Sequence, residues 1–211
     1  MRAFTDPTAR KLALTGVAAV ASLLLSACGS ANDSAGDAAS GTKPGSRPSA
    51  AGSPAAGAFN DADVAFAQAM IPHHQQALEM AKLADGRAED TGVKKIVADV
   101  EKAQDPEIQT MRSWLKAWGR PESAGRSGHG AGHAMAGMMS ERDMKDLESL
   151  RGRAFDRKFA ELMIAHHEGA VEMAKTEQKD GRDATAKKLA DDVVRTQSAE
   201  IAELKKILDR I

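Results

Sequence analysis

The pattern of apolar and polar residues predicts a chain that folds into long helices. Apolar side chains recur every three or four residues along four segments, which is the spacing of one face of an α-helix. These segments span about residues 60–84, 91–118, 155–179 and 184–208. Two prolines lie inside the pattern, so we expect a kink at Pro72 and either a kink or a division of the helix at Pro106.

The residues at the ends of these segments are suited to start and stop helices. Asn60 or Asp61 can cap the first helix, and Gly86 is expected to end it because glycine tolerates positive φ. Gly181 is expected to end the third helix. The sequence Ser140–Asp143 resembles a capping box, so a short additional helix is predicted to follow it.

A long-range repeat connects the first and third segments. The sequence MIPHHQQALEMAK at residues 70–82 returns 93 residues later as MIAHHEGAVEMAK at residues 163–175. The match continues downstream, where a Gln-x-x-Glu-Ile sequence begins at Gln104 and again at Gln197. A period this long repeats a helical hairpin, and two copies are too few for a solenoid. The sequence therefore predicts an all-α fold of two helical hairpins, packed as one four-helix bundle with an approximate internal two-fold axis.

The start of the chain differs in character from the bundle. Residues 1–28 have the charged start of an export signal, and the apolar run from Leu12 to Leu25 is too short for an ordinary membrane span. The run ends in Leu-Ser-Ala-Cys, which resembles the lipobox of bacterial lipoproteins and implies that Cys28 becomes lipidated. An ordinary cleaved secretory signal is the alternative. Either way the folded part, residues 59–211, is expected outside the cytoplasm. In the favoured case, the lipid on Cys28 would anchor it to the bacterial cell membrane.

Composition limits the classes of function. Residues 29–58 are mostly Ala, Gly, Ser, Pro and Thr and are predicted to form a disordered tether, because they cannot bury enough apolar surface to fold. The formal net charge of −1 gives no electrostatic reason to expect nucleic acid as a partner. Cys28 is the only cysteine, which excludes an intramolecular disulfide framework. Trp114 and Trp118 lie one helical turn apart and are interpreted as core residues or as the contact of a homo-oligomer.

The repeated motif concentrates side chains that bind metal ions. Its two copies contain four of the six histidines and four of the ten methionines. Successive helical residues point about 100° apart, so one histidine of each pair is expected to face the core while its neighbour lies beside the seam. The methionines lie one turn before and two turns after each pair. The candidate ligands are His73, His74, His166, His167, Met70, Met80, Met163 and Met173.

Copper suits this set of side chains best. Imidazole binds zinc, copper, nickel and iron, whereas the soft sulfur of a thioether favours Cu(I). Cu(II) would use the imidazoles alone. Zinc is the alternative if Glu168 or another carboxylate joins the histidines in place of the methionines. Glu107 and Glu200 occupy matching positions and could orient the histidines, although such residues more often form hydrogen bonds between helices.

A glycine-rich loop at residues 121–139 joins the two hairpins and adds further metal-binding side chains. A plain linker has no need of them, and short histidine-rich tracts are typical of metal binding. Our hypothesis is that the loop captures ions and passes them to the bundle. This auxiliary site would consist of His129, His133, Met135, Met138 and Met139.

Two other classes of function are weighed against metal binding. Histidine pairs can form hydrogen bonds across a bundle and methionines can fill its core, which would make the protein a structural or interaction module without a metal. A redox enzyme on a ferritin-like scaffold is disfavoured. Di-iron bundles use Glu-x-x-His, and neither copy of the motif has a glutamate three residues before a histidine. We therefore expect no enzymatic turnover.

The doubled motif also resembles a known family. Two copies of M-[IV]-x-H-H-x-x-A-[LV]-E-M-A, each followed by Q-x-x-E-I, resemble the secreted bacterial family known as domain of unknown function 305. The resemblance covers about residues 59–210 and implies a ferritin-like four-helix bundle. It also implies copper binding by the histidines and methionines of the motif, since some members are periplasmic copper-binding proteins implicated in copper resistance. It does not cover the loop, whose interpretation rests on composition.

Overall fold

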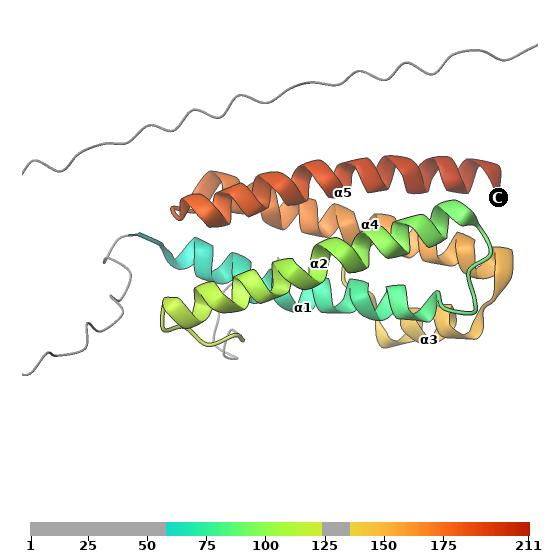
Figure 1. The fold of residues 1–211 in the computed structure, drawn as a ribbon, viewed down its shortest axis with the longest axis horizontal. Helices are drawn as coiled ribbons and strands as arrows, with labels where there is room; N and C mark the ends of the chain where they lie inside the picture. Colours follow the sequence, from blue (N-terminus) through green and yellow to red (C-terminus); the bar gives the residue numbers. More distant parts are fainter. Residues whose placement is uncertain (1–57, 124–135) are drawn as a thin grey trace, which may run out of the picture. The chain divides into compact units, whose positions relative to one another are not determined.

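The computed structural model describes residues 58–123 and 136–211, which contain five helices (Figure 1). Four are long: α1 (Asp61–Leu83), α2 (Thr91–Ala117), α4 (Gly152–Asp180) and α5 (Ala184–Arg210). The short α3 (Glu141–Ser149) follows α2 in the sequence. These two stretches contain no strand, which confirms the predicted all-α fold. The predicted export signal and almost all of the tether lie outside the described residues, as do Cys28, His129, His133 and Met135.

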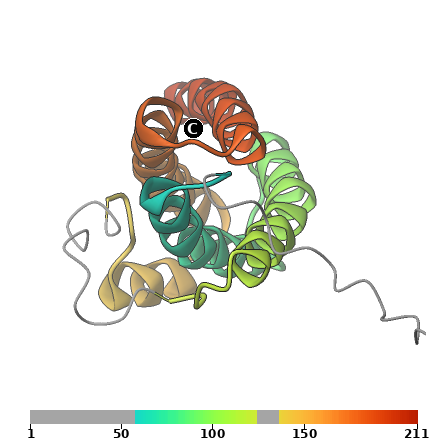
Figure 2. The same cartoon turned by 90° about the vertical axis from the view of Figure 1, so that its left-hand side faces the viewer.

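The long helices form two antiparallel hairpins that pack together as a four-helix bundle. α1 packs against α2 and α4, and α5 packs against α4 and α2. Figure 2 shows this ring of four helices from one end, with α3 outside the ring on the side of α1 and α4. The predicted bundle of two repeated hairpins is therefore confirmed.

The helix ends agree with the capping residues in the sequence. Asn60 caps α1 and Ser140 caps α3, each in a capping box. Gly86 follows α1 with a φ of 64°, as expected of a glycine that ends a helix. α4 begins at Gly152, earlier than the predicted residue 155, and the N–H of Gly152 donates to the carbonyl of Arg87.

Neither proline divides its helix. α1 continues through Pro72 and α2 continues through Pro106, so the division of α2, which was one of the two expected outcomes, does not occur. Both prolines lie on the exposed sides of their helices. The backbone carbonyl that each proline leaves without a donor can therefore be hydrated, which lowers the cost of keeping the helix intact.

The core of the bundle consists of a polar layer between two apolar layers. One apolar layer includes Val93, Val100, Phe155, Phe159 and Leu204. The other includes Val64, Phe66, Ile108, Met111 and Leu115. Near the middle of the four long helices, between these layers, the buried residues are His73, His74, Gln104, His166, His167 and Gln197. Burying polar groups is unfavourable unless they find partners, so this layer needs a specific explanation.

Two buried aspartates tie each hairpin to the turn of the other. Asp156 on α4 accepts hydrogen bonds from two backbone N–H groups of the α1–α2 turn, those of Glu89 and Asp90. Asp63 on α1, its counterpart in the repeat, accepts from the α4–α5 turn, at Arg182 and Asp183. Sequence reasoning missed both aspartates, although they are equivalent in the two copies. Their contacts connect the two hairpins at both ends of the bundle.

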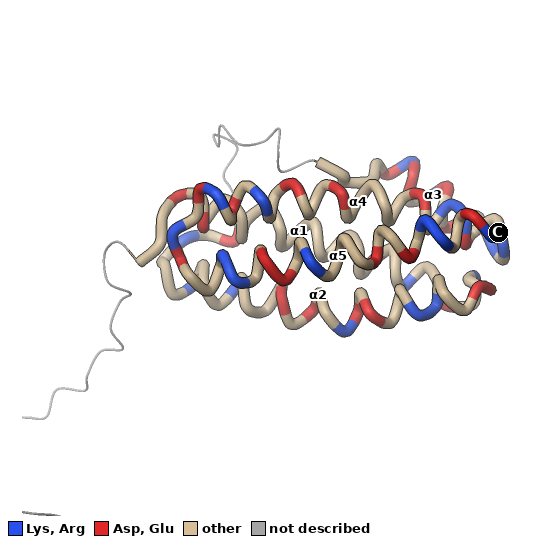
Figure 3. The backbone as a smooth tube through the Cα atoms, turned by 90° about the horizontal axis from the view of Figure 1, so that it is seen from above, with Lys and Arg blue, Asp and Glu red and all other residues tan. Residues whose placement is uncertain are grey.

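The outer faces of the bundle carry charges of both signs. Lysines and arginines alternate with aspartates and glutamates along the long helices (Figure 3). Some form pairs within one helix, such as Lys95 with Asp99 and Lys188 with Asp192. Among the described helices, none is both long and apolar enough to cross a membrane.

Glu177 on α4 is a buried carboxyl group beside Asp63. Its exposed fraction is 1%. Burial and the neighbouring Asp63 raise the pKa of Glu177 to about 8, so this side chain is protonated at neutral pH. Its counterpart in the first copy is Ala84, and the feature is therefore a difference between the two hairpins.

Replacing Glu177 by glutamine should stabilise the fold progressively as the pH rises from about 4.5 to 8. The folded protein keeps this proton up to about pH 8, whereas the unfolded chain loses it near 4.5, so folding of the native protein weakens through this window. Glutamine does not titrate. The Glu177→Gln variant should therefore gain about 1 kcal/mol or more over the native protein between pH 5 and pH 8, measured by urea unfolding. Glu79→Gln, on the exposed face of α1, is the control, and equal pH dependence in the Glu177 variant and the native protein would contradict the assignment.

Candidate metal centre

The polar layer brings the two copies of the motif together. His73 and His74 come from α1, and His166 and His167 come from α4, the helix that packs against it. All four side chains are buried, with exposed fractions of at most 1%. The candidate histidines of the two copies therefore lie together in one buried layer. Metal sites in helical bundles are commonly built from such facing side chains.

The first histidine of each pair lies at the contact between α1 and α4. The ring centroids of His73 and His166 are 3.7 Å apart, with an angle of 39° between the ring planes. Nε2 of His73 donates to the backbone carbonyl of Ala136, at 3.2 Å. This acceptor comes from the end of the loop between the hairpins, which sequence reasoning did not anticipate.

The second histidine of each pair turns towards the other helix of its own hairpin. Nε2 of His74 lies 2.7 Å from Oε2 of Glu107 on α2 and forms a hydrogen bond with it. Nε2 of His167 lies 2.7 Å from Oε2 of Glu200 on α5, at ion-pair distance but without the angle of a hydrogen bond. One histidine of each pair was expected to face the core and its neighbour to lie beside the seam between helices. The two rings of each pair do point in different directions, but all four are buried in the core.

Several nitrogens of these rings are buried without a partner. Nδ1 of all four histidines has no hydrogen-bond partner, and neither does Nε2 of His166. Burial, reinforced by the neighbouring histidines, lowers the pKa of His73 to about 3 and the pKa of His166 well below its ordinary value. These two imidazoles are therefore neutral at physiological pH, and a neutral imidazole has a lone pair for a metal ion.

The four candidate methionines lie on both sides of the histidines. Met70 and Met173 belong to one apolar layer, and Met80 and Met163 belong to the other. Each layer thus receives one thioether from each copy of the motif, because α1 and α4 run in opposite directions. All four methionines are buried. The layer of imidazoles is therefore flanked by soft sulfur ligands along the bundle axis.

A short segment covers the histidines on the side of α1 and α4. We call this segment, Ala136–Met139, the strap. Two hydrogen bonds connect it to α1, since the N–H of Met139 donates to Gln76 and the amide of Gln76 donates to the carbonyl of Met139. Against α4 the strap lies so close that a Cβ atom on Gly169 would be 2.2 Å from the carbonyl oxygen of Ala136.

The strap explains a difference between the two copies of the motif. Gln76 and Gly169 occupy equivalent positions in the repeat. The glutamine binds the backbone of the strap, whereas the glycine leaves room for it. Gly137, which lies in the strap and has a φ of 74°, is equally close to the backbone of α4. A mismatch at this position was the signal in the sequence that could have revealed the strap.

Some of the remaining candidate residues lie at the histidine cluster and others do not. Glu168, the residue considered for a zinc site, is exposed and lies 3.4 Å from Lys205, outside the histidine cluster. Glu107 and Glu200 do contact the histidines. Of the auxiliary site in the loop, the described residues include only Met138 and Met139, which are half-buried in the strap.

The histidines contact one another directly in this structure. Among the described residues, no three His, Cys, Asp or Glu side chains are placed to hold a metal ion together. With metal–nitrogen bonds of about 2 Å, two imidazoles that share a tetrahedral ion have ring centroids about 5 Å apart. His73 and His166, at 3.7 Å, would have to separate or rotate to admit an ion between them. The donor atoms are present, and binding requires their rearrangement.

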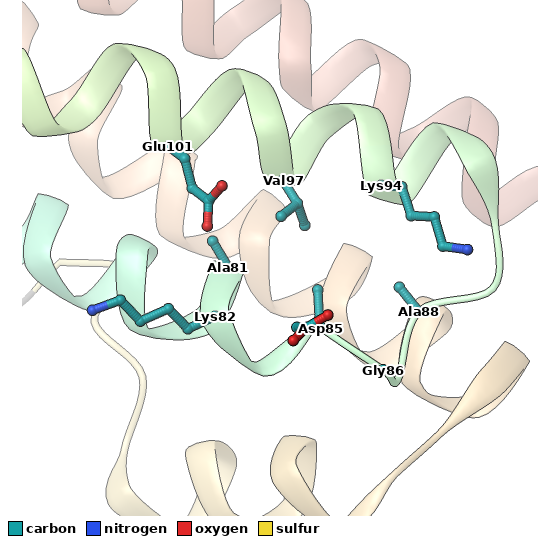
Figure 4. A pocket seen from close by; sticks show the side chains of 9 residues that line it. Ala81, Lys82, Asp85, Gly86, Ala88, Lys94, Val97 and Glu101 are labelled. Carbon is teal, nitrogen blue, oxygen red and sulfur yellow. The ribbon is translucent and has the colours of Figure 1, made fainter.

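Two open grooves on the described part of the surface contain none of these candidate ligands. One lies between the end of α1 and the start of α2 and is lined by charges of both signs, including Lys82, Asp85, Lys94 and Glu101 (Figure 4). A second groove, between α2 and α5, is lined partly by Glu200. The chemistry of the protein is therefore expected in the buried layer.

Comparison with known proteins identifies the family. The family model described as "Domain of unknown function (DUF305)" matches residues 63–208. The chain belongs to the DUF305 family. A DUF305 protein from Streptomyces coelicolor, provisionally described as secreted, has 32% identity and a TM-score of 0.66, covering 70% of this chain and 92% of its own. A DUF305 fragment from Deinococcus radiodurans has 32% identity and a TM-score of 0.64, covering 72% of this chain and 98% of its own.

Another similar structure contains bound metal. CopM in its Cu(II)-bound form has 34% identity and a TM-score of 0.59, covering 70% of this chain and 95% of its own, and its Cu(I)-bound form gives the same values. CopM is also known in a silver-bound form. Comparison with curated proteins finds no match. Metal binding is therefore established among the relatives of this chain.

Replacing Gly169 by alanine should destabilise the protein. At an ordinary position inside a helix this change would stabilise by up to about 1 kcal/mol. Here the added methyl group would collide with the carbonyl of Ala136 and displace the strap, so we expect a net loss of about 1–3 kcal/mol. Urea unfolding measures the change, and Gln76→Ala should weaken the same contact. A Gly169→Ala variant more stable than the native protein would show that the strap does not lie against α4.

Proposed function

We propose that this protein binds copper through the histidines and methionines of its repeated motif. The observation that carries the proposal is the buried layer of imidazoles, in which six ring nitrogens have no hydrogen-bond partner. Groups of this kind are rare in folded proteins because leaving them unpaired is unfavourable. A metal ion would satisfy them. The four buried thioethers on either side supply additional ligands.

Copper is favoured over zinc by the chemistry of these groups. Thioether sulfur is soft and prefers Cu(I), whereas neutral imidazoles bind both Cu(I) and Cu(II). Glu168, one of the carboxylates that could have favoured zinc, is exposed on the other side of its helix, whereas Glu107 and Glu200 contact the histidines at Nε2. The relatives support the same choice, since CopM is known with Cu(I), Cu(II) and silver bound.

The proposed role is to sequester copper or hand it on, without catalytic turnover. The donor set contains no carboxylate in the Glu-x-x-His arrangement of di-iron bundles. The buried position of the histidines also favours storage of an ion over rapid exchange with a substrate. A structural bundle without a metal is the competing function, and the titration below separates the two.

We further propose that the protein works outside the cytoplasm as a lipoprotein attached through Cys28. The support is the lipobox-like sequence that ends at this residue. The loop residues His129, His133, Met135, Met138 and Met139 would form the auxiliary capture site, which stays a prediction from composition. Anchoring and capture would both concentrate copper handling at the membrane surface.

A titration of the purified protein with Cu(I), Cu(II) and Zn(II) tests the proposal. We expect tight copper binding by the native protein. The variant with His73, His74, His166 and His167 all changed to alanine should lose it. Circular dichroism must show that the variant is still helical. Absence of copper binding by the native protein would favour the structural function, and binding retained by a folded variant would place the site elsewhere.

Replacing the methionines by leucine should separate the two oxidation states of copper. Leucine has nearly the same volume as methionine, so the core stays filled while the sulfur ligand is lost. In a variant with Met70, Met80, Met163 and Met173 changed to leucine, Cu(I) affinity should fall about tenfold or more, whereas Cu(II) affinity should change little. Met111→Leu, a buried methionine outside the motif, is the control. Unchanged Cu(I) affinity would show that the imidazoles bind the ion alone.

A further inference from the structure

Three of the four imidazoles are contacted at the same ring nitrogen by groups from outside α1 and α4. Nε2 of His74 contacts Glu107 on α2, and Nε2 of His167 contacts Glu200 on α5, both at 2.7 Å. Nε2 of His73 donates to the carbonyl of Ala136 in the strap. In each case the other nitrogen, Nδ1, is buried and has no partner.

The chemistry of the acceptors decides which nitrogen carries the proton. A carbonyl oxygen and a carboxylate oxygen have only lone pairs to offer and would repel a lone pair on a nitrogen this close, so the proton of each contacted imidazole belongs on Nε2. A proton on Nδ1 would instead be a buried donor without an acceptor, which is unfavourable. The lone pair of His73, His74 and His167 therefore lies on Nδ1.

We infer that Glu107 and Glu200 are positioning residues, which fix His74 and His167 so that Nδ1 is the atom that binds the metal. This inference rests on the proposed function. The two glutamates occupy equivalent positions in the repeat, and each is largely buried, with side-chain exposures of 18% and 15%. A carboxylate behind a metal-binding histidine holds the ring in one orientation and strengthens it as a donor.

His166 differs from the other three histidines. Neither of its ring nitrogens has a hydrogen-bond partner or a carboxylate at ion-pair distance, since the carbonyl of Ala136 accepts from His73, its counterpart in the repeat. His166 is therefore the ring that no group from outside α1 and α4 holds in place by a contact at a ring nitrogen. Since the contact of 3.7 Å with His73 leaves no room for an ion, one of these two rings would have to move for an ion to bind between them, and His166 is the one without a fixed partner.

The first test determines the tautomers by ¹⁵N NMR of the histidine rings, in the purified protein without metal and after addition of Cu(I), which is diamagnetic. We expect His74 and His167 to carry the proton on Nε2 before and after addition. The Nδ1 resonances should shift when Cu(I) binds. A proton on Nδ1 in the metal-free protein, or a shift of Nε2 in place of Nδ1, would overturn the inference.

The second test measures Cu(I) affinity in variants of the two glutamates. Changing Glu107 and Glu200 to alanine removes the acceptors and should lower the affinity about 10–100-fold. Changing both to glutamine keeps an acceptor oxygen and should restore most of this affinity and the Nε2 tautomer. Glu168→Ala, which removes an exposed glutamate next to His167 in the sequence, is the control and should leave the affinity unchanged.

These outcomes separate the inference from the proposed function. Copper binding by the native protein, together with unchanged affinity in the alanine variant, would overturn the positioning role and leave copper binding intact. No copper binding by the native protein would overturn both. If the alanine variant does not fold, the NMR measurement on the native protein and the glutamine variant still decide the assignment.

Discussion

The structure depends on the burial of a polar layer in the middle of an otherwise apolar bundle. Four histidines and two glutamines occupy positions that leucine or valine would normally fill in such a core. Burying them costs free energy, because water no longer solvates their nitrogens and oxygens. The apolar layers on both sides, with Phe155 and Phe159 in one and Met111 and Leu115 in the other, offset this cost and hold the four helices together. The proposed metal binding would offset part of this cost, because an ion would satisfy the unpaired ring nitrogens.

The approximate two-fold symmetry of the repeat places equivalent residues of both copies around the histidines. Because α1 and α4 run in opposite directions, each apolar layer receives one motif methionine from each copy, as with Met70 and Met173. The buried aspartates are related in the same way, each accepting hydrogen bonds from the turn of the other hairpin. The strap breaks this symmetry. It accepts a hydrogen bond from His73 and leaves His166 without a partner, so two histidines that are equivalent in the sequence have different contacts in the structure.

The histidine layer has different neighbours on its two sides. The strap lies over the histidines on the side of α1 and α4, where Gln76 binds it and Gly169 leaves space for it. On the side of α2 and α5 the glutamates that contact His74 and His167 remain partly exposed. Glu107 and Glu200 are thus the polar groups that connect the buried imidazoles to the solvent, while the backbone of the strap closes the opposite side.

The fold could be predicted from the sequence alone, because local signals and the repeat agreed. Apolar spacing gave the four long helices, the Asn60 and Ser140 caps gave two of the starts, and the 93-residue repeat gave the pairing of hairpins. It also gave the eight candidate ligands, since residue type and helical spacing place them on one side of each helix. Only the tertiary structure decided what those ligands contact. The acceptor for His73 is a backbone carbonyl of Ala136, the partners of the two hairpin turns are Asp63 and Asp156, and Pro106 does not divide α2. These contacts join residues that are far apart in the chain. The type of a residue says little about which backbone group the fold will bring next to its side chain.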